Sequence, residues 1–524
     1  MPIRMVDDPN DQFDNSGSDS GGGGRRPSGG GGGILSLLPL LFTLIRNPVG
    51  LVLVLVVGGF LYFKGGCTSM VQQPASDSQL ATGGILDPKQ FDKAQIYEAT
   101  DESKSNLPEA VSLLKFAPSP GDQGQQGSCV AWSSAYGART ILESSTTGID
   151  ADKIKFSPSF MYNQIGLDGC QGSYIIRAME NMTRVGAVPL DQFPYDDRDC
   201  STKPPSQLMQ EASQYRMLGF TRLTDGDNVK NLDLYAIKEH LAKDVPVVIG
   251  MMVGGSFMEG MMGQKVWHPT DEDYNMIGFG GHAMCVIGYD DRMEGGAFQI
   301  LNSWGPQWGQ NGVGFIRYND FKQFTREAYG LNPMPKKGSA AAQNLECSIG
   351  LVDNKTKQYI PLQLKTGNTF STKQPMIKGT QFKMEVKNSS ECYVYVLGME
   401  TDGSSYVLFP YPMKNDATRT KYSPYCGLTG YRLFPRGMSM MADSIGTKDF
   451  MAVIVSKDSM NVFQLNSMVN SSRSSGFVQA VNNAVKQAAI SGVNFISTST
   501  GTINFKTQAG TKAAVASIVE IDKR

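Results

Sequence analysis

The feature that most constrains this chain is a pair of apolar runs near its N-terminus. Residues 34–45 read ILSLLPLLFTLI and residues 49–63 read VGLVLVLVVGGFLYF, with Arg-Asn-Pro between them. Neither run has an amphipathic period. As a helix, the second run would be roughly 22 Å long at 1.5 Å per residue. That is less than the ~30 Å hydrocarbon core of a bilayer, so the run needs local thinning or support from its flanks. We predict a single transmembrane helix within residues 34–64, opened by Pro48, and the alternative is a buried core helix.

Basic residues flank this predicted helix unequally. Arg25, Arg26 and Arg46 precede it, whereas only Lys64 follows closely. The positive-inside rule therefore predicts a cytoplasmic N-terminus and a periplasmic or otherwise extracytoplasmic remainder. The region before the runs is too long for a typical cleaved signal peptide. The Lys-Gly-Gly before Cys67 also lacks the aliphatic residue of a bacterial lipobox. We expect a single-pass membrane protein.

Composition divides the rest of the chain. Residues 1–33 are rich in Gly, Ser and Asp and are predicted to be a disordered cytoplasmic tail. Residues 65–105 are polar, lack a strong period, and are predicted to be a stalk. The Pro, Lys, Gly and Ala content of residues 334–345 marks a linker between two folded units, 106–333 and 346–524. A chain of 524 residues also exceeds one ordinary core.

Charge and cysteine content exclude several functional classes. A formal net charge of −1 gives no electrostatic reason to expect a nucleic-acid partner. Eight cysteines do not make a disulfide scaffold, and no Cys-x-x-Cys pair or Cys/His cluster indicates a metal site. We predict neither a metal nor a cofactor. The three histidines, His240, His268 and His282, are the only candidates for an imidazole base.

One cysteine lies where a helix is expected to begin, in the stretch GDQGQQGSCVAW that ends at Trp132. In the first helical turn, Cys129 would face the positive end of the helix dipole and unpaired backbone N–H groups, which favour a thiolate nucleophile. Ser128 is a candidate cap for this helix. Gln123 could donate its side-chain amide to an oxyanion. The alternative is a buried structural cysteine, because free cysteine is among the most buried residue types.

A histidine and an asparagine later in the chain suit this cysteine. FGGHAMCVIGYDD contains His282 at the start of an apolar strand, and FQILNSWGPQWG contains Asn302 at the end of the next. His282 would accept the proton of Cys129, and the amide oxygen of Asn302 would fix the orientation and tautomer of the imidazole. Trp304 is placed to shield that hydrogen bond from water.

These segments resemble those of papain-like (C1-type) cysteine peptidases. QGQQGSCVAW resembles the glutamine-to-cysteine segment of the family, GGHAMCVIGYDD its histidine strand and NSWGPQWGQNGVGF its asparagine segment, in the family's order. LPEAV at residues 107–111 resembles the mature N-terminus, and GCQGSYIIRAM at residues 169–179 resembles the segment lining the unprimed subsites. The resemblance covers about residues 106–329.

The resemblance implies an α+β, two-lobed fold with a helical lobe and a β-barrel-like lobe. It also implies hydrolysis of peptide or protein substrates through a thioester acyl-enzyme, without a cofactor. The residues it assigns are Cys129, His282 and Asn302 as the catalytic triad, Gln123 in the oxyanion hole, Trp304 as the shield of the triad, and Gly172 and Ser173 in substrate binding.

The chain departs from the family at two positions beside the cysteine. Val130 stands where an aromatic residue is usual, and Gln126 replaces a cysteine. The family partner of that missing cysteine is the position of Cys170, and Cys200 resembles half of another disulfide whose first half is missing. We hypothesise that Cys170 and Cys200 pair with each other, which would contribute ~3 to 4 kcal/mol. Two free buried cysteines are the alternative.

The stretch before Leu107 does not resemble the long helical propeptide of the family's zymogens. We expect it to be too short to fill the cleft and fold separately. Control of activity is then expected from location, from partners or from the second unit.

Residues 346–524 are expected to form a β-sandwich-like binding or regulatory domain. TQFKMEVKNSSECYVYVLGMETDGSSYVLFPYP and DFMAVIVSK predict strands, and FVQAVNNAVKQAA predicts a helix. This unit resembles a bacterial module of unknown function that is often appended to caspase-like or papain-like enzymes. The whole chain therefore resembles a bacterial membrane-anchored peptidase, with a cell-envelope protein as candidate partner. Cys347, Cys392 and Cys426 can supply one disulfide of unspecified pairing.

The remaining histidines are not expected to act in catalysis. His240 is predicted on the exposed face of a helix, and His268 in a Met- and Gly-rich loop that borders the cleft at most. Two alternatives to a peptidase stay open. One is a weak or inactive papain-like scaffold of the cell envelope, which Val130 favours. The other is acyl transfer by the same triad, whose motifs do not match.

Overall fold

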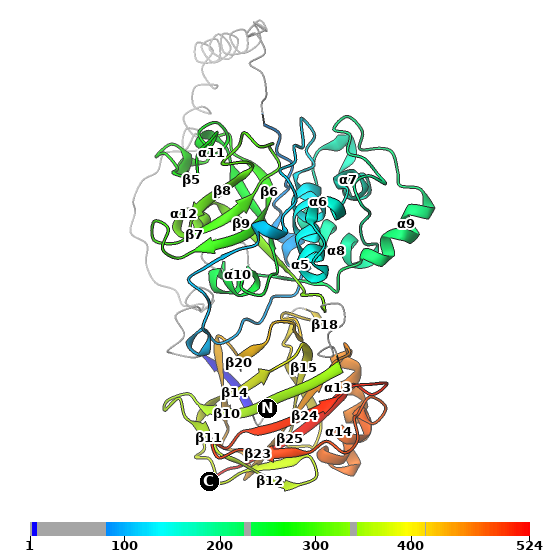
Figure 1. The fold of residues 1–524 in the computed structure, drawn as a ribbon. Coiled ribbons are helices and arrows are strands. Elements are labelled where there is room, and N and C mark those ends of the chain that lie inside the picture. The colour runs from blue at the N-terminus through cyan, green and yellow to red at the C-terminus, as the bar shows by residue number, and fades with distance from the viewer. Residues whose placement is uncertain (1–2, 8–79, 225–231, 336–342, 414–415) are drawn as a thin grey trace, which may run out of the picture. The chain divides into compact units, whose positions relative to one another are not determined.

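The computed structural model describes residues 3–7, 80–224, 232–335, 343–413 and 416–524 (Figure 1). The predicted transmembrane helix lies outside the described residues, as do most of the predicted tail, the first part of the stalk and most of the linker. Across the described ranges, no helix has the length and apolar character that a membrane crossing requires. We call residues 80–335 the N-terminal domain and residues 343–524 the C-terminal domain.

A central helix organises the helical lobe of the N-terminal domain. It begins as α4 (Cys129–Ala131), continues through the π-helical segment η4 (Trp132–Arg139) and ends as α5 (Thr140–Thr147). Gly148 stops it in the left-handed conformation, at φ 76°. Residues 129–142 are all buried, because small side chains let neighbours pack on every side. The surrounding helices are α6 (Ala151–Ile154), α7 (Pro158–Ile165), α8 (Ile175–Arg184) and α9 (Ser206–Ala212).

A sheet with the strand order β3-β9-β4-β6-β7-β8-β5 forms the second lobe, and β2 pairs with β6. The strands are β2 (Ala110–Ser112), β3 (Phe220–Arg222), β4 (Val247–Val253), β5 (Val266–Trp267), β6 (Gly280–Asp290), β7 (Ala297–Leu301), β8 (Val313–Arg317) and β9 (Thr325–Leu331). The accompanying helices are α10 (Leu234–Leu241), α11 (Gly255–Met258) and α12 (Tyr318–Phe324). Residues 282–289 of β6 are buried, which matches their nearly continuous apolar sequence.

The C-terminal domain is a sandwich of two sheets, as expected from its sequence. One sheet has the order β1-β21-β14-β10-β24-β23, with β11 and β20 attached, and the other has the order β12-β13-β25-β22-β15-β16, with β19 attached. Apolar side chains from both sheets form one core between them. A second apolar cluster joins the latter sheet to the helices α13 (Val462–Ser471) and α14 (Phe477–Val485), visible as the orange coils of Figure 1. The sequence indicated α14 but not α13.

The strands of this domain are β10 (Asn344–Asp353), β11 (Tyr359–Ile360), β12 (Leu362–Thr366), β13 (Thr369–Thr372), β14 (Gln381–Asn388), β15 (Cys392–Met399), β16 (Ser405–Phe409), β19 (Tyr425–Cys426), β20 (Gly430–Phe434), β21 (Met438–Ala442), β22 (Lys448–Ser456), β23 (Phe495–Ser497), β24 (Ile503–Gln508) and β25 (Ala514–Asp522). A separate hairpin consists of β17 (Pro412–Met413) and β18 (Asp416–Thr420).

The predicted disorder of the tail is wrong for its first described residues. These form β1 (Ile3–Asp7), which pairs antiparallel with β21, Ile3 opposite Ala442. Ile3 is buried, and Met5 packs against the same core. Because Ile3 and Met5 alternate along this edge strand, both side chains face the core between the two sheets.

The predicted stalk is also wrong from residue 80 onwards. Asp87 caps a short helix, α3 (Pro88–Phe91), and Phe91 is buried. The residues Ala94–Thr100, which we call the strap, are buried as well, except for Gln95. Their polar composition indicated a solvated segment. They are buried because their backbone and polar side chains find hydrogen-bond partners in both domains.

Candidate active site

Cys129 is the first residue of α4, as the sequence predicts, although Ser128 does not cap the helix. The Ser128 hydroxyl lies 2.7 Å from that of Tyr195 instead. The Cys129 side chain is fully buried, and its Sγ accepts a hydrogen bond from the backbone N–H of Ala283 at 3.4 Å. Because Ala283 follows His282 on β6, this contact brings the cysteine of the helical lobe beside the histidine of the sheet lobe.

His282 and Asn302 meet at the ends of neighbouring strands. His282 lies near the start of β6, and Asn302 directly follows β7. His282 Nε2 lies 2.7 Å from Asn302 Oδ1, which also accepts the Ser303 N–H at 2.8 Å. His282 Nδ1 is buried and has no hydrogen-bond partner among the described residues. One ring nitrogen is thus fixed by the amide oxygen, and the other is left free.

Trp304 covers this pair. Its ring stacks on the imidazole of His282 with a centroid distance of 4.2 Å and an interplanar angle of 21°. Trp304, His282 and Asn302 are all buried. The indole therefore keeps water from the hydrogen bond between His282 and Asn302, which is the role that the sequence assigned to it.

The side chain of Gln123 is held in one orientation. Its Oε1 accepts the hydroxyl of Ser303 at 2.7 Å, and its Nε2 donates to the carbonyl oxygens of Gln126 at 2.9 Å and of Ala81 at 3.1 Å. The indole N–H of Trp304 donates to the same oxygen of Ala81 at 2.8 Å. The Ala81 carbonyl thus accepts from the side-chain amide of Gln123, the donor that we predicted to bind an oxyanion.

The carbonyl of Ala81 belongs to a segment that fills the cleft, Leu80–Leu86, which we call the plug. The N–H groups of Gly83 and Gly84 both donate to the carbonyl of Gly281, at 3.2 Å and 2.9 Å. A Cβ on Gly83 would lie 2.1 Å from the carbonyl oxygen of Gly127, so only glycine fits there. The expectation that this stretch is too short to fill the cleft is wrong, because an extended segment held by its backbone is sufficient.

Gly172 and Ser173, predicted to bind substrate, bind the plug. The Ser173 N–H donates to the Gly83 carbonyl at 2.9 Å, and the Ser173 carbonyl accepts the Ile85 N–H at 3.0 Å. This is a parallel bridge between Ser173 and Gly84. Gly172 has a φ of +93°, and a Cβ there would lie 2.2 Å from the Gly83 oxygen. Both residues therefore contact an extended peptide backbone, here that of the chain itself.

The structure joins Cys170 and Cys200 in a disulfide. Gln126, which replaces the family's cysteine, contacts the loop before Cys200, and its Nε2 donates to the carbonyl of Asp199 at 3.2 Å. A hydrogen bond thus ties that loop to the residues before Cys129. Val130 is fully buried in the core of the domain.

Burial shifts the pKa values of both reacting groups. It raises the pKa of the Cys129 thiol to about 12, against the opposing effect of backbone N–H groups that include those of Ala283 and Gly84. It lowers the pKa of His282 to about 4, against the opposing effect of the hydrogen bond to Asn302. With the plug in place, both groups are therefore uncharged at neutral pH, because the desolvated site disfavours an ion pair.

The other two histidines lie away from the cleft chemistry. His240 was expected on an exposed helix face but is buried. Its Nδ1 lies 2.7 Å from the carbonyl of Ala236, and its ring packs edge-on against Tyr97 at 4.7 Å. The prediction was wrong because the strap and β9 cover this face of α10: besides Tyr97, Gly330 lies so close that a Cβ on it would be 2.3 Å from His240 Nε2. His268 is exposed and pairs with Glu294 at 2.8 Å.

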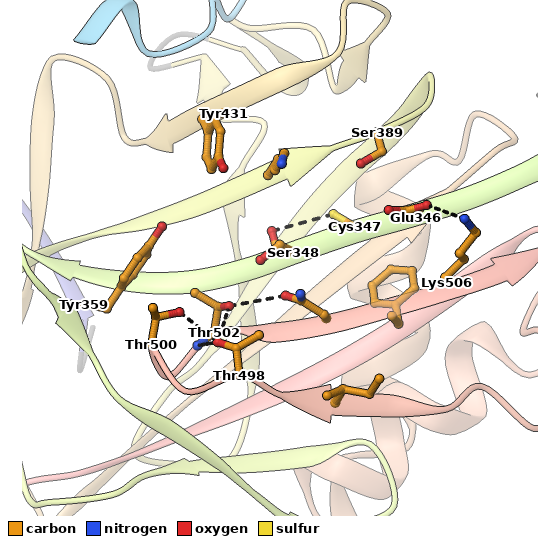
Figure 2. Close-up of a pocket in the computed structure, with 14 residues that line it drawn as sticks. Glu346, Cys347, Ser348, Tyr359, Ser389, Tyr431, Thr498, Thr500, Thr502 and Lys506 are labelled. Carbon is orange, nitrogen blue, oxygen red and sulfur yellow. Dashed lines mark hydrogen bonds and ion pairs between the residues drawn. The ribbon is translucent and has the colours of Figure 1, made fainter. Parts of the chain in front are cut away.

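The C-terminal domain has a hollow of about 470 Å³ over its first sheet (Figure 2). Its labelled residues include Tyr359, Tyr431, Ser348, Ser389, Thr498, Thr500 and Thr502, and Lys506 pairs with Glu346 at 3.0 Å. Cys347 is buried here, burial raises its thiol pKa, and the domain contains no histidine that could act as its base. Cys392 lies opposite Cys426 in the pairing of β15 with β19, and Cys347, Cys392 and Cys426 are all free thiols.

A helical lobe that presents a cysteine to a histidine and an asparagine of a sheet lobe defines a cysteine peptidase domain of the papain type. The model of the papain family of cysteine proteases matches residues 115–332. Residues 115–332 are therefore a papain-family C1 cysteine peptidase domain.

Known proteins resemble this part of the chain at low identity. A peptidase C1-like protein of Acanthamoeba polyphaga mimivirus is 28% identical over 218 residues, which cover 39% of this chain and 64% of the relative. The cathepsin B-like CP2 of Giardia intestinalis is 27% identical over 225 residues, which cover 41% and 70%. The chain thus spans about two thirds of the length of these relatives. Xylellain, a cysteine protease from Xylella fastidiosa, aligns at 22% identity with a TM-score of 0.39, covering 48% of this chain and 95% of its own.

Reasoning from sequence missed the plug and the strap. The one local signal for the plug is the pair Gly83-Gly84 between apolar residues in an otherwise polar stretch. A glycine pair is also typical of flexible linkers, so the pattern alone does not predict a cleft-filling segment.

Proposed function

We propose that this protein is a latent cysteine peptidase that hydrolyses peptide bonds through Cys129, His282 and Asn302. The observation that carries the proposal is the state of the imidazole. Its Nε2 is bonded to Asn302 Oδ1 at 2.7 Å, and its buried Nδ1 is free on the ring beside the sulfur. An Nε2–H tautomer held by Asn302 leaves the Nδ1 lone pair to accept the thiol proton.

The reaction follows from these positions. Nδ1 of His282 takes the proton of Cys129, and the thiolate attacks the carbonyl carbon of a bound peptide. The negatively charged oxygen of the tetrahedral intermediate accepts a hydrogen bond from the Gln123 Nε2–H, which binds the Ala81 carbonyl while the plug is in place. The C–N bond then breaks, Nδ1–H protonates the leaving amine, and a thioester remains on Cys129. Water then gives a proton to Nδ1 as its oxygen attacks the carbonyl carbon of the thioester. The C–S bond breaks, the acid is released, and Nδ1–H returns the proton to the Cys129 sulfur.

Latency follows from the plug. The plug takes up backbone groups of the cleft, because the N–H groups of Gly83 and Gly84 bond to the Gly281 carbonyl and the Gly83 carbonyl accepts the Ser173 N–H. The plug also excludes water and so contributes to the desolvation that keeps the thiol protonated. Removal of the plug is expected to free Gln123, admit a substrate and lower the pKa of the thiol.

An inactive scaffold is the second candidate, favoured by the complete burial of Cys129 and its raised pKa. Labelling by an epoxide thiol probe separates the two. In the full chain carrying Gly83→Val, which expels the plug, we expect rapid labelling that Cys129→Ala abolishes and His282→Ala slows by about 100-fold or more. Hydrolysis of casein should follow the same order. No Cys129-dependent labelling at any pH would establish the scaffold, and labelling without hydrolysis would favour acyl transfer.

The proposal extends to attachment of the protein to a membrane through residues 34–64, with the peptidase domain outside the cytoplasm and a cell-envelope protein as partner. The apolar runs and their flanking charges support it. The pairing of β1 with β21 bears on the orientation. Within one chain, it places residues 3–7 and the C-terminal domain on the same side of the membrane and so counts against a single crossing. The following test decides between the flanking charges and this pairing. An N-terminal tag that resists external protease on intact cells would support the single crossing, and a degraded tag would oppose it.

A further inference from the structure

The strap is held by the peptidase domain along one of its edges. Its backbone pairs with β3, where the Arg222 N–H donates to the Gln95 carbonyl and the Tyr97 N–H donates to the Arg222 carbonyl, both at 2.9 Å. The Glu239 carboxylate of α10 accepts the Tyr97 hydroxyl at 3.1 Å and the Thr100 N–H at 3.3 Å. These contacts fix the strap to the peptidase domain, whose latency the proposal above assigns to the plug.

The other edge of the strap is held by the C-terminal domain. The Ile96 N–H donates to the Lys421 carbonyl, and the Ser423 N–H donates to the Ile96 carbonyl, both at 2.9 Å. Ile96 therefore pairs on both sides, with Arg222 of one domain and Tyr422 of the other. The strap is the middle of a three-stranded contact in which each domain supplies one flank.

Arg432 of β20 joins the two domains through the strap. It is fully buried, and it donates from Nε to the Glu98 carbonyl at 2.9 Å and from Nη2 to the Tyr97 hydroxyl at 3.1 Å. The same guanidinium donates to Asn388 and Leu428 of its own domain at 2.7 Å each. Such a buried charge is stable only while its partners are in place, so the strap and the C-terminal domain depend on each other.

Two further contacts reach toward the plug. Arg419 of β18 donates from Nη2 to the carbonyls of Asp92 and Lys93, at 3.2 Å and 3.1 Å. These residues directly follow α3, which in turn follows the plug. The C-terminal domain therefore holds the chain close to the point where it enters the cleft.

We propose that the C-terminal domain is the anchor of the plug: by clamping the strap against the peptidase domain, it keeps the plug in the cleft and the peptidase latent. The inference rests on the proposed function. Without the clamp, the strap keeps only its contacts with β3 and Glu239 of the peptidase domain. Each time these contacts open as well, the next fixed point after the plug is β2, so the tether becomes about three times as long and the effective concentration of the plug at the cleft falls by about fivefold. The clamp also directs the chain that leaves α3 toward the cleft, which raises the effective concentration of the plug further.

The test uses the full chain and two readouts. The first is the rate of Cys129 labelling by an epoxide probe, and the second is hydrogen exchange of the plug amides, which needs no catalysis. We expect Arg432→Met to raise both by about fivefold or more. Arg419→Ala, whose side chain lies at the surface, should raise both to a smaller extent without unfolding the domain. Arg473 lies in the short turn after α13, is exposed and pairs with Asp402 at 3.9 Å. Arg473→Ala is the matched control and should change neither readout.

Gly83→Val separates this inference from the proposed function. If Gly83→Val labels rapidly while Arg432→Met and Arg419→Ala keep the wild-type labelling rate and the wild-type exchange of the plug, the anchoring role is overturned. If Gly83→Val itself does not label, the proposed function fails and this inference with it. Thermal melting shows whether a variant is unfolded. If Arg432→Met is unfolded, the result for Arg419→Ala decides whether the C-terminal domain anchors the plug.

Discussion

The plug and the strap lie close together in the chain, yet they are held by different chemistry. The plug binds through its backbone: the polar contacts of Ala81, Gly83 and Ile85 described above are all made by main-chain groups. The strap binds through its backbone and through side chains, chiefly Tyr97, which contacts Glu239 and Arg432.

The difference shows how each segment can be released. The plug fits because Gly83 has no Cβ, so we expect a methyl group at this position to expel the plug. The strap fits because polar atoms are present and paired, so removing one of them weakens it. Each segment also lies beside a buried histidine: Gly84 lies against the backbone of His282, and Tyr97 packs against the ring of His240, so we expect protonation of either imidazole to affect the neighbouring segment.

Adding atoms to the plug is expected to have the largest effect. A Cβ on Gly83 would lie 2.1 Å from a backbone oxygen, whereas a Cβ on Gly84 would lie 3.2 Å from its nearest neighbours. Overpacking costs about 1–3 kcal/mol, so Gly83→Ala should raise the rate of Cys129 labelling by about 100-fold and Gly84→Ala by less than about tenfold. Equal rates in the two variants would show that the fit of the plug does not depend on the missing Cβ.

Acid is expected to have the next largest effect, through both segments. Burial lowers the pKa of His282 and of His240 to about 4. Their ordinary pKa is about 6.5, so the stability they contribute is complete above that pH and is lost as the pH falls toward 4. At pH 5 the loss is about 2 kcal/mol for each histidine. Burial raises the pKa of Glu98 and of Glu327 to about 8, so these two carboxyls gain stability over the same fall in pH and oppose the loss. The expected readout is therefore a difference: between pH 7 and pH 5, His240→Gln should gain about 2 kcal/mol of stability relative to the unaltered chain. If the difference in Tm between the two proteins does not change over this range, the lowered pKa of His240 is contradicted.

Removing one hydroxyl from the strap is expected to have an intermediate effect. Tyr97→Phe keeps the ring that packs against His240 but loses the hydrogen bonds with Glu239 and Arg432. Leaving a buried donor or acceptor without its partner costs about 1–3 kcal/mol, and Arg432 keeps its other hydrogen bonds. Probe labelling should rise by about fivefold, while labelling in the Gly83→Val background should not change. An increase in that background as well would mean that Tyr97 acts on the site directly.

Removing a bond at the rim of the strap is expected to have the smallest effect. Gln95 donates from Nε2 to the Thr420 hydroxyl at 2.7 Å, and Gln95 is exposed to solvent. Because water can replace this bond, Gln95→Met should cost about 0.5 kcal/mol and change the labelling rate by less than about threefold. A larger change would place Gln95 among the main anchors of the strap.

Much of the candidate site was predictable because its residues lie within short sequence motifs. The segments around Cys129, His282 and Asn302 carry both the reacting groups and the local turns that present them, and Gln123 and Trp304 lie within the same motifs. The departures were less predictable in their effect. That Gln126 would bind the loop before Cys200 depends on a contact between segments far apart in the chain.

From the sequence by itself came the candidate catalytic residues, through the order of their motifs, the two-lobed domain, through the resemblance to papain-like peptidases, and the strands of the sandwich, through their alternating pattern. Only the tertiary structure decided that the plug lies in the cleft, that the strap is shared by two domains and that His240 is buried. Each of these depends on which distant backbone groups come opposite one another. A polar, glycine-containing stretch has the same composition whether water or protein satisfies its hydrogen bonds, so composition could not distinguish a solvated stalk from a buried one.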